Sequence, residues 1–202
     1  MTRPIRTSLS LVALCFAAHA ALAATSTDII TVAAATGTPG ANVDVPVYIR
    51  DTSGTPLGID QPAGARIQSY SIKVDYAPTA SVQSVTFVRA GITSALTPIF
   101  ESSPSSPGSI SLIDTFSESI DLIPFVSNAP LPGNQIGVLH FTLASNAAQG
   151  TVTLTLDPTL TQLSNQAGTT TQTVGAGNLS LVDGSITINA ATPVRLQSFE
   201  VN

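Results

Sequence analysis

The chain has 202 residues, of which 43% are hydrophobic and only 9% are charged, and this balance excludes a disordered polyelectrolyte and a coiled coil. Acidic residues outnumber Lys and Arg by twelve to seven, and two of those seven cations lie within the first six residues. A nucleic-acid-binding protein needs a basic face that displaces phosphate counterions, so cations this few and scattered exclude nucleic acid as a partner.

The N-terminus, residues 1–23, has the features of a secretory signal peptide. Two arginines begin it, the apolar stretch Leu9–Ala18 follows, and Ala21–Ala23 offers a small-residue cleavage site. We therefore expect a secreted mature protein that begins near Ala24 and is located extracellularly, at the cell surface or in the periplasm. The apolar stretch is shorter than the about 20 residues that cross a bilayer, so no membrane span is expected.

The only cysteine, Cys15, lies inside this signal segment. The mature chain therefore has no disulfide, no cysteine-ligated metal and no cysteine nucleophile, and its stability must come from packing. Its length suits one domain, which we place at residues 24–190, followed by a C-terminal tail or linker stub at residues 191–202.

The mature chain is rich in Thr, Val, Ile and Ser and is interrupted by Gly and Pro at short intervals, which favours β-strands. The clearest strand spans residues 42–50, where four apolar residues alternate with polar ones. Pro46 lacks a backbone N–H and so predicts that this strand is an edge strand or carries a bulge. Alternation or β-rich composition predicts further strands at residues 29–35, 67–76, 81–88, 109–115, 136–144, 151–157 and 184–189. Long connections are expected at residues 51–66 and 97–108, and a polar, proline-rich one at 117–135.

About eight short strands with one apolar and one polar face predict an all-β protein, an antiparallel β-sandwich. Several motifs then occur in a characteristic order: residues 38–47 (TPGANVDVPV), 72–78 (IKVDYAP), 81–85 (SVQSV), 108–112 (GSISL), 136–143 (IGVLHFTL) and 182–188 (VDGSITI). In this order the chain resembles a cohesin domain over residues 29–189. The resemblance implies a nine-stranded antiparallel β-sandwich with jelly-roll topology.

The same resemblance implies a non-catalytic module that recognises a dockerin-like or other extracellular protein through an exposed sheet face. Its contact residues would be the solvent-facing residues of one strand, together with a histidine on another: Ser69, Ser71, Lys73, Asp75 and His140. The family's Asn-x-Asp pattern on the partner-facing strand is absent here, where Ser69 and Ser71 stand, and its Asp after Tyr is Ala77. The resemblance therefore does not extend to the residues that bind a typical dockerin.

Residues for catalysis are scarce in the mature chain, and we predict that the protein is not an enzyme. A hydrolytic triad needs a histidine, and His140 is the only one after the signal segment, with no G-x-S-x-G motif beside it. Glycoside hydrolysis needs two carboxylates across a sugar-filled cleft. We interpret Glu101, Asp114, Glu118 and Asp121 as solvated loop acids instead, because the chain has no Trp to line such a cleft.

No cofactor is expected, although calcium stays an open alternative. Four acids lie in or beside predicted loops and could offer oxygen ligands: Asp51, Asp60, Asp114 and Asp121. No D-x-D-x-D-G run accompanies them.

Two other functions remain as alternatives. The protein could be a carbohydrate-binding module associated with polysaccharide degradation, since such modules share the sandwich architecture and hold sugars on rows of aromatic rings. Alternation leaves Tyr48 as the exposed tyrosine, and Phe100, Phe116 or Phe125 could add to it from loops. A purely structural cell-surface or matrix domain is the other alternative.

Overall fold

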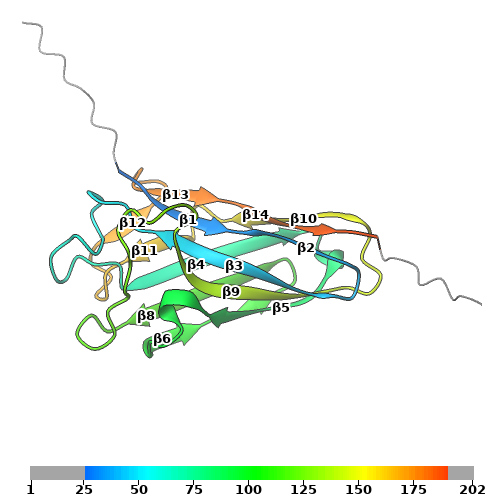
Figure 1. The fold of residues 1–202 in the computed structure, drawn as a ribbon, viewed down its shortest axis with the longest axis horizontal. Helices are drawn as coiled ribbons and strands as arrows, with labels where there is room; N and C mark the ends of the chain where they lie inside the picture. Colours follow the sequence, from blue (N-terminus) through cyan, green and yellow to red (C-terminus); the bar gives the residue numbers. More distant parts are fainter. Residues whose placement is uncertain (1–25, 191–202) are drawn as a thin grey trace, which may run out of the picture.

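A computed structural model describes residues 26–190, which form the predicted β-sandwich: two sheets packed face to face around one core (Figure 1). The predicted signal peptide and the tail at residues 191–202 lie outside the described residues. The five-stranded sheet has the order β13 (Leu179–Val182), β1 (Asp28–Val32), β3 (Asn42–Arg50), β9 (Asn134–Leu143) and β5 (Val82–Arg89). Within the described range no helix has the length and apolarity to cross a bilayer.

The nine-stranded sheet centres on β4 (Ser69–Ala77), which has β8 (Ser109–Phe116) along one side. Along the other side, β10 (Gly150–Leu156) and β11 (Gln162–Ser164) each pair with part of β4. The remaining strands extend the sheet outward from these: β14 (Gly184–Ile188), β2 (Ala34–Gly37), β12 (Thr171–Thr173), β6 (Pro98–Ser102) and β7 (Ser105–Ser106). Two short 3-10 turns, η1 (Thr79–Ser81) and η2 (Gly91–Thr93), flank β5.

The sheets are mixed, because the first and last strands of the described range both cross from one sheet to the other. The chain passes from β1 to β2 across Ala33 and from β13 to β14 across Asp183, so these segments run side by side and parallel in both sheets. Every other strand pair in residues 26–190 is antiparallel, as predicted.

Gly184 makes this double crossing possible. A Cβ atom at position 184 would lie 2.4 Å from the carbonyl oxygen of Ala33 and 2.7 Å from Cγ1 of Val32. Contacts this short do not occur in folded proteins, so only glycine lets the two crossing segments pass. The preceding Asp183 accepts a hydrogen bond of 2.9 Å from the backbone N–H of Leu156, which fixes the crossing against β10.

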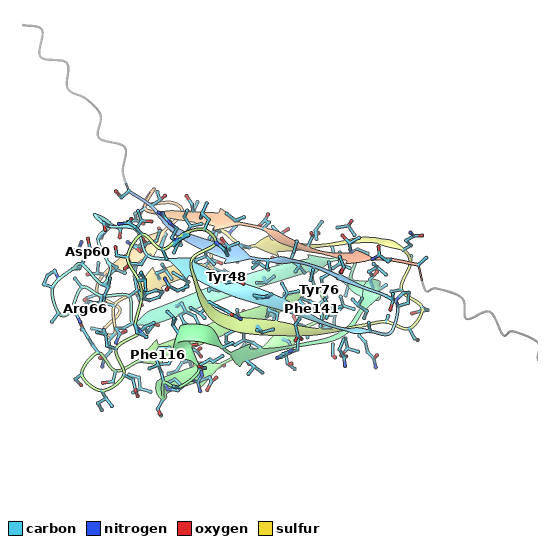
Figure 2. The ribbon with its side chains drawn as sticks, in the orientation of Figure 1. Tyr48, Asp60, Arg66, Tyr76, Phe116 and Phe141 are labelled. Carbon is cyan, nitrogen blue, oxygen red and sulfur yellow. The ribbon has the colours of Figure 1, made fainter. Side chains whose placement is uncertain are left out.

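The core follows the predicted alternation. The inward residues of β3 and β4 are almost fully buried, and Tyr76 of β4 meets Phe141 of β9 edge-on, with ring centroids 5.7 Å apart across the two sheets (Figure 2). Each fully buried aliphatic or aromatic side chain of this kind contributes about 1.5–3 kcal/mol. Tyr70 and Tyr76, expected in the core, are 1% and 6% exposed.

Pro46 does not mark an edge strand, since β3 lies between β1 and β9. Its carbonyl accepts the N–H of Ala33, so its ring nitrogen points the same way, toward the gap where the chain crosses from β1 to β2. The missing N–H therefore costs no hydrogen bond to β9. A register shift next to it, between Val47 and Tyr48, provides the predicted irregularity.

Five short strands were not predicted. The segment at residues 97–108, expected as a connection, forms β6 and β7 along the edge of β8. Strands β11, β12 and β13 have three or four residues each. Strands this short show too few alternating positions for a sequence pattern to reveal them.

Candidate functional site

The outer face of the nine-stranded sheet carries four of the five predicted contact residues. Ser69, Ser71, Lys73 and Asp75 lie along β4 with their side chains half-buried on this face. Each stands opposite a residue of β8 that also points outward, in the order Thr115, Ile113, Ser111 and Ser109. The alternation of β4 is sufficient to place them, because its apolar residues all enter the core.

Lys73 is the only basic side chain on β4, and it holds two carboxylates. Its Nζ atom lies 3.2 Å from Asp75 Oδ1 and 3.2 Å from Asp157 Oδ2, and hydrogen bonds to these acids raise the pKa of Lys73. Asp157 also accepts hydrogen bonds from the hydroxyl and backbone N–H of Thr159, and these bonds hold the pKa of Asp157 well below its usual range. Lys73 and Asp157 therefore both stay charged at neutral pH.

Three apolar side chains share this face with the polar ones. The sequence analysis considered Phe100 only as a loop aromatic for sugar binding, and it missed the other two, Ile113 and Leu160. Phe100 of β6 and Leu160 are 55% and 54% exposed, while Ile113 of β8 is half-buried. Phe100 stands opposite Thr115, and the carbonyl of Leu160 accepts the Ser71 hydroxyl at 3.4 Å, so the apolar groups flank the β4 serines. We call this surface the β4 face and define it by Ser69, Ser71, Lys73, Asp75, Phe100, Ile113 and Leu160. Alternation within residues 109–116 could have identified Ile113, since it follows the parity of Ser109 and Ser111.

His140 does not belong to the β4 face. It points outward from β9, which lies in the five-stranded sheet, so it is on the opposite side of the sandwich. Its Nδ1 atom lies 2.6 Å from Oδ1 of Asp44, the residue opposite it on β3. The predicted outward orientation is confirmed, whereas grouping His140 with the β4 residues is wrong because β9 and β4 lie in different sheets, whose outer faces point in opposite directions.

The aromatic residues do not form a row for sugar binding. Tyr48 is half-buried on the outer face of the five-stranded sheet, since it alternates along β3 with the buried Val47 and Ile49. Phe116 and Phe125 are buried, at 0% and 7% exposure, and Phe100 lies on the other sheet. The structure thus does not bring together the aromatic side chains that the carbohydrate alternative requires.

Three of the four acids considered for glycoside hydrolysis bind neighbouring groups near the surface. Glu101 Oε1 lies 3.1 Å from Arg89 Nε, and Asp121 Oδ2 accepts the N–H of Thr97 at 3.2 Å. Both oxygens of Glu118 accept the N–H of Gly64 at 2.9 Å. These carboxylates hold strands and loops in place and do not face one another as a catalytic pair.

Asp114 is the exception, and its expected place in a loop is wrong. It lies in β8, is fully buried, and accepts a short hydrogen bond from the Tyr70 hydroxyl. Burial raises the pKa of Asp114 to about 6, although the hydrogen bond from Tyr70 acts to lower it. Residue 114 has the same parity as Ile110, Leu112 and Phe116, so the alternation of this strand contained the signal for its burial.

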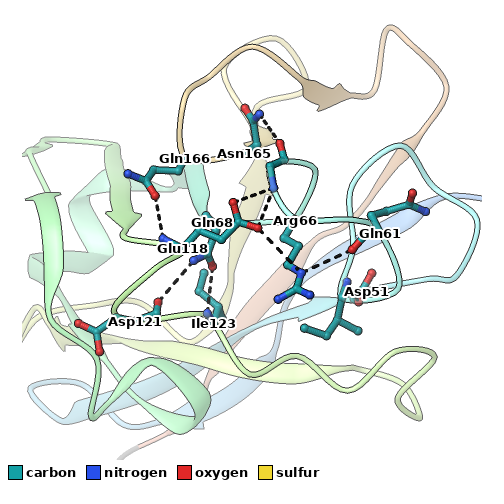
Figure 3. A network of polar contacts seen from close by, with 11 residues as sticks. Asp51, Gln61, Arg66, Gln68, Glu118, Asp121, Ile123, Asn165 and Gln166 are labelled. Atoms are coloured by element: carbon teal, nitrogen blue, oxygen red, sulfur yellow. Dashed lines mark hydrogen bonds and ion pairs between the residues drawn. The ribbon is translucent and has the colours of Figure 1, made fainter.

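A polar network joins three loops at one end of the sandwich (Figure 3). Glu118 binds Gly64, whose carbonyl accepts Asn165 Nδ2 at 2.7 Å, and the Gln166 side chain accepts the N–H of Glu118 at 2.7 Å. A hollow of about 390 Å³ lies beside these residues. Because the polar groups of the network already bind one another, the network fixes the loops and does not present a set of free ligands.

Of the four acids considered for calcium, the structure brings Asp51 and Asp60 together beside Gly58. Asp114 and Asp121 instead bind Tyr70 and Thr97. Among residues 26–190 there is no group of three His, Cys, Asp or Glu side chains arranged to hold a metal ion.

Comparison with known proteins identifies the fold. No family model matches the chain, and no curated protein matches it in sequence. Among solved structures, the seventh ScaB type I cohesin from Pseudobacteroides cellulosolvens shares 17% identity, with a TM-score of 0.55 over 86% of this chain and 99% of that one.

Two further cohesins match with similar scores. The sixth cohesin of Acetivibrio cellulolyticus scaffoldin B, solved with a mutant Cel5 dockerin, has 14% identity and a TM-score of 0.57 over 81% of this chain and 100% of that one. A non-cellulosomal cohesin from the archaeon Archaeoglobus fulgidus has 13% identity and a TM-score of 0.52 over 81% and 92%. The described part of the chain therefore has the fold of cohesin domains.

Proposed function

We propose that this protein is a secreted, non-catalytic cohesin-like module that binds a dockerin-like protein through the β4 face. The observation that carries the proposal is the composition of that face: exposed apolar side chains beside serine hydroxyls and one ordered charge cluster. Protein interfaces combine an apolar centre with a polar rim in this way. Solved cohesins with this fold include several in complex with dockerins.

The charge cluster gives the β4 face a means of selecting its partner. Asp75 is the more exposed of the two acids bound to Lys73, with 45% of its side chain accessible against 17% for Asp157. A basic side chain of the partner can therefore approach Asp75 without breaking the contact between Lys73 and the less exposed Asp157. Such a contact at the edge of an interface contributes mainly to association rate and specificity.

The absence of the family's Asn-x-Asp pattern at Ser69 and Ser71 supports a partner that differs from typical dockerins. Serine hydroxyls both donate and accept hydrogen bonds and carry no charge, so they favour polar, uncharged groups of the partner at this point. Binding would then depend more on Phe100, Ile113 and Leu160 than on charged hydrogen bonds.

A matched pair of substitutions tests the proposal. Phe100→Asp places a charge on the β4 face, while Val88→Asp does so on the other sheet, at a residue 53% exposed. Secreted proteins of the source organism captured by the immobilised wild-type protein are identified, and their affinities are measured with each variant. We expect a saturable partner whose affinity falls at least about 30-fold with Phe100→Asp and is unchanged with Val88→Asp.

Two results would count against the proposal. Equal loss or equal retention with both variants would remove the β4 face as the binding surface. A failure to find any saturable partner, with the variants as stable as the wild type in urea, would instead favour the structural cell-surface or matrix alternative.

A further inference from the structure

Buried polar atoms without a partner gather at the end of the sandwich where β1 begins. Five such side-chain atoms occur in the described part of the chain, and four of them belong to Asp28, Asp51 and Gln172, each fully buried. Asp28 and Asp51 take neighbouring register positions on β1 and at the end of β3, since Ile29 pairs with Arg50. Gln172 enters from β12 of the other sheet and lies close enough to affect the ionisation of Asp28. We call these three side chains the Asp28 cluster.

One oxygen of Asp28 ties the loop at residues 51–66 to β1. Asp28 Oδ1 accepts the backbone N–H of Thr52 at 2.7 Å and the hydroxyl of Thr55 at 3.4 Å. The backbone N–H of Asp28 donates to the carbonyl of Asn178 at 3.1 Å, in the connection between β12 and β13. A single residue therefore joins the start of the loop to the strands on both sides of it.

The other oxygen of Asp28 needs a proton to form a hydrogen bond within the cluster. Asp28 Oδ2, Asp51 Oδ1 and both polar atoms of Gln172 lack partners. An ionised carboxylate only accepts hydrogen bonds, whereas a protonated one also donates, and the Gln172 carbonyl oxygen is an acceptor without a donor. The Gln172 amide acts to lower the pKa of Asp28, yet it forms no hydrogen bond of ordinary geometry. Protonation thus completes a network that the ionised form leaves open.

The charged groups that face this cluster are acids. Asp51 faces Asp28 from the end of β3, and Asp60 faces Asp51 from the loop. Strands β12 and β13, which flank β1 on its other side, contain no charged residue. Burial, followed by the opposing hydrogen bond from Thr52 and the charge of Asp51, raises the pKa of Asp28 to about 7.

The nearby arginines bind other groups. Arg50 donates to the carbonyl of Ala129 at 2.8 Å, and Arg66 lies 3.9 Å from Glu118 (Figure 3). Within residues 26–190 no ion pair includes an acid of the Asp28 cluster. A charge on Asp28 therefore stays without a counter-charge as long as the loop is closed.

A hollow of about 300 Å³ brings solvent to the outside of the loop. Its lining includes Ser26, two residues before Asp28, and Gly54 and Pro56, the two neighbours of the buried Thr55. The turn before β13 closes its other side. Movement of the loop at Thr55 would join this hollow to the Asp28 cluster, and water would then hydrate a charged carboxylate.

We propose that Asp28 is a proton-dependent latch: its neutral form holds the loop at residues 51–66 closed against β1 and β12, and loss of the proton lets the loop open. The closed form binds more protons than the open form between the ordinary pKa of 3.8 and the raised value of about 7. Opening therefore becomes easier as pH rises through this window and stays constant above it. The device needs no partner protein, so it goes beyond the binding function proposed above.

Hydrogen–deuterium exchange of the whole purified chain at pH 5 and pH 8 tests the latch. The reporters are loop amides such as those of Thr52 and Ile59, which donate to Asp28 and Asp51. After correction for the intrinsic pH dependence of exchange, their protection should fall by about 10- to 100-fold from pH 5 to pH 8. A carboxyl-carbon NMR titration of the wild type measures the pKa of Asp28 without any substitution.

Three variants assign the effect. Asp28→Asn keeps the shape of the side chain and removes its charge, so loop protection should differ by less than about 3-fold between the two pH values. Asp51→Asn should shift the change to lower pH, because the charge of Asp51 raises the pKa of Asp28. Asp114→Asn, at a buried acid of the other sheet, should keep the wild-type change. Unchanged protection in the wild type, a pH-dependent loop that persists in Asp28→Asn, or an NMR pKa of Asp28 below about 5 would each overturn the proposal.

Discussion

The buried carboxyl of Asp114 allows a sharp test of how burial and hydrogen bonding compete in this core. Its pKa in the folded protein is about 6, raised from 3.8 by burial, although the Tyr70 hydroxyl donates to it. The folded protein therefore binds more protons than the unfolded chain between about pH 4 and pH 6, and stability falls as pH rises through that window. Above about pH 6 the carboxyl is ionised in both states, and the full free-energy cost of burying its charge lowers the stability of the folded protein.

Asp114→Asn removes the charge and keeps the shape of the side chain. One pKa unit corresponds to 1.36 kcal/mol, so a shift from 3.8 to about 6 corresponds to about 3 kcal/mol at most. We expect the variant to be more stable than the wild type by up to this amount at about pH 8. The gain should shrink as pH falls and vanish below about pH 3, where the wild-type carboxyl is protonated in both states.

Urea unfolding of both proteins at a series of pH values measures the difference. Asp28 also has a raised pKa, about 7, caused by burial, but it is present in both proteins and cancels. Tyr70→Phe supplies a second test, because losing the donor should destabilise the charged form more than the neutral one. If Asp114→Asn is less stable than the wild type at pH 8, then the bond to Tyr70 outweighs the cost of burial and the reasoning fails.

Three further predictions concern the crossing, the surface histidine and the charge cluster. Gly184→Ala should lower the free energy of unfolding in urea by about 2–4 kcal/mol, because the new Cβ would meet the Ala33 carbonyl. The control Gly175→Ala has nothing within 4 Å of its Cβ and should change stability by less than about 0.5 kcal/mol. Equal effects of the two substitutions would refute the steric argument. His140→Ala should alter stability by less than about 0.5 kcal/mol in calorimetry, since the pair of His140 with Asp44 is exposed. Partner affinity should be unchanged in a binding assay, because His140 lies on the other sheet from the β4 face. Loss of partner binding would instead place the interface on the five-stranded sheet. Because the pKa of Asp157 is lowered, its contribution is present above about pH 4 and is lost as pH falls, so Asp157→Asn should be less stable than the wild type at neutral pH and match it in strong acid.

Alternation predicted the parts of the fold where long strands have one face in the core. Residues 42–50 were predicted as a strand with the bounds that β3 has, and β4 has the predicted outward residues. The same reasoning did not assign strands to sheets, because alternation distinguishes inside from outside but not one outer face from the other. His140 was therefore grouped with residues on the opposite side of the sandwich.

The candidate sites depended on long-range contacts that a sequence pattern does not contain. Asp51 and Asp60 meet only because the loop returns to the end of β3, with Gly58 between them. Asp28 and Asp114 were more accessible to prediction, since each shares its parity with core residues of its own strand. The polarity of Asp114 led to its assignment to a solvated loop, which the tertiary structure overrode, and Asp28 was not considered.

The parallel pairing of the first and last strands has a mechanical consequence. The two ends of residues 26–190 leave the sandwich at opposite ends of its long axis, as Figure 1 shows. Tension applied between them would slide β1 along β13 and β2 along β14, so the backbone hydrogen bonds of both pairs would carry the force together instead of opening one after another. A module that links a partner to a surface under flow would gain from this arrangement, and force spectroscopy should show a higher rupture force for the wild type than for Gly184→Ala.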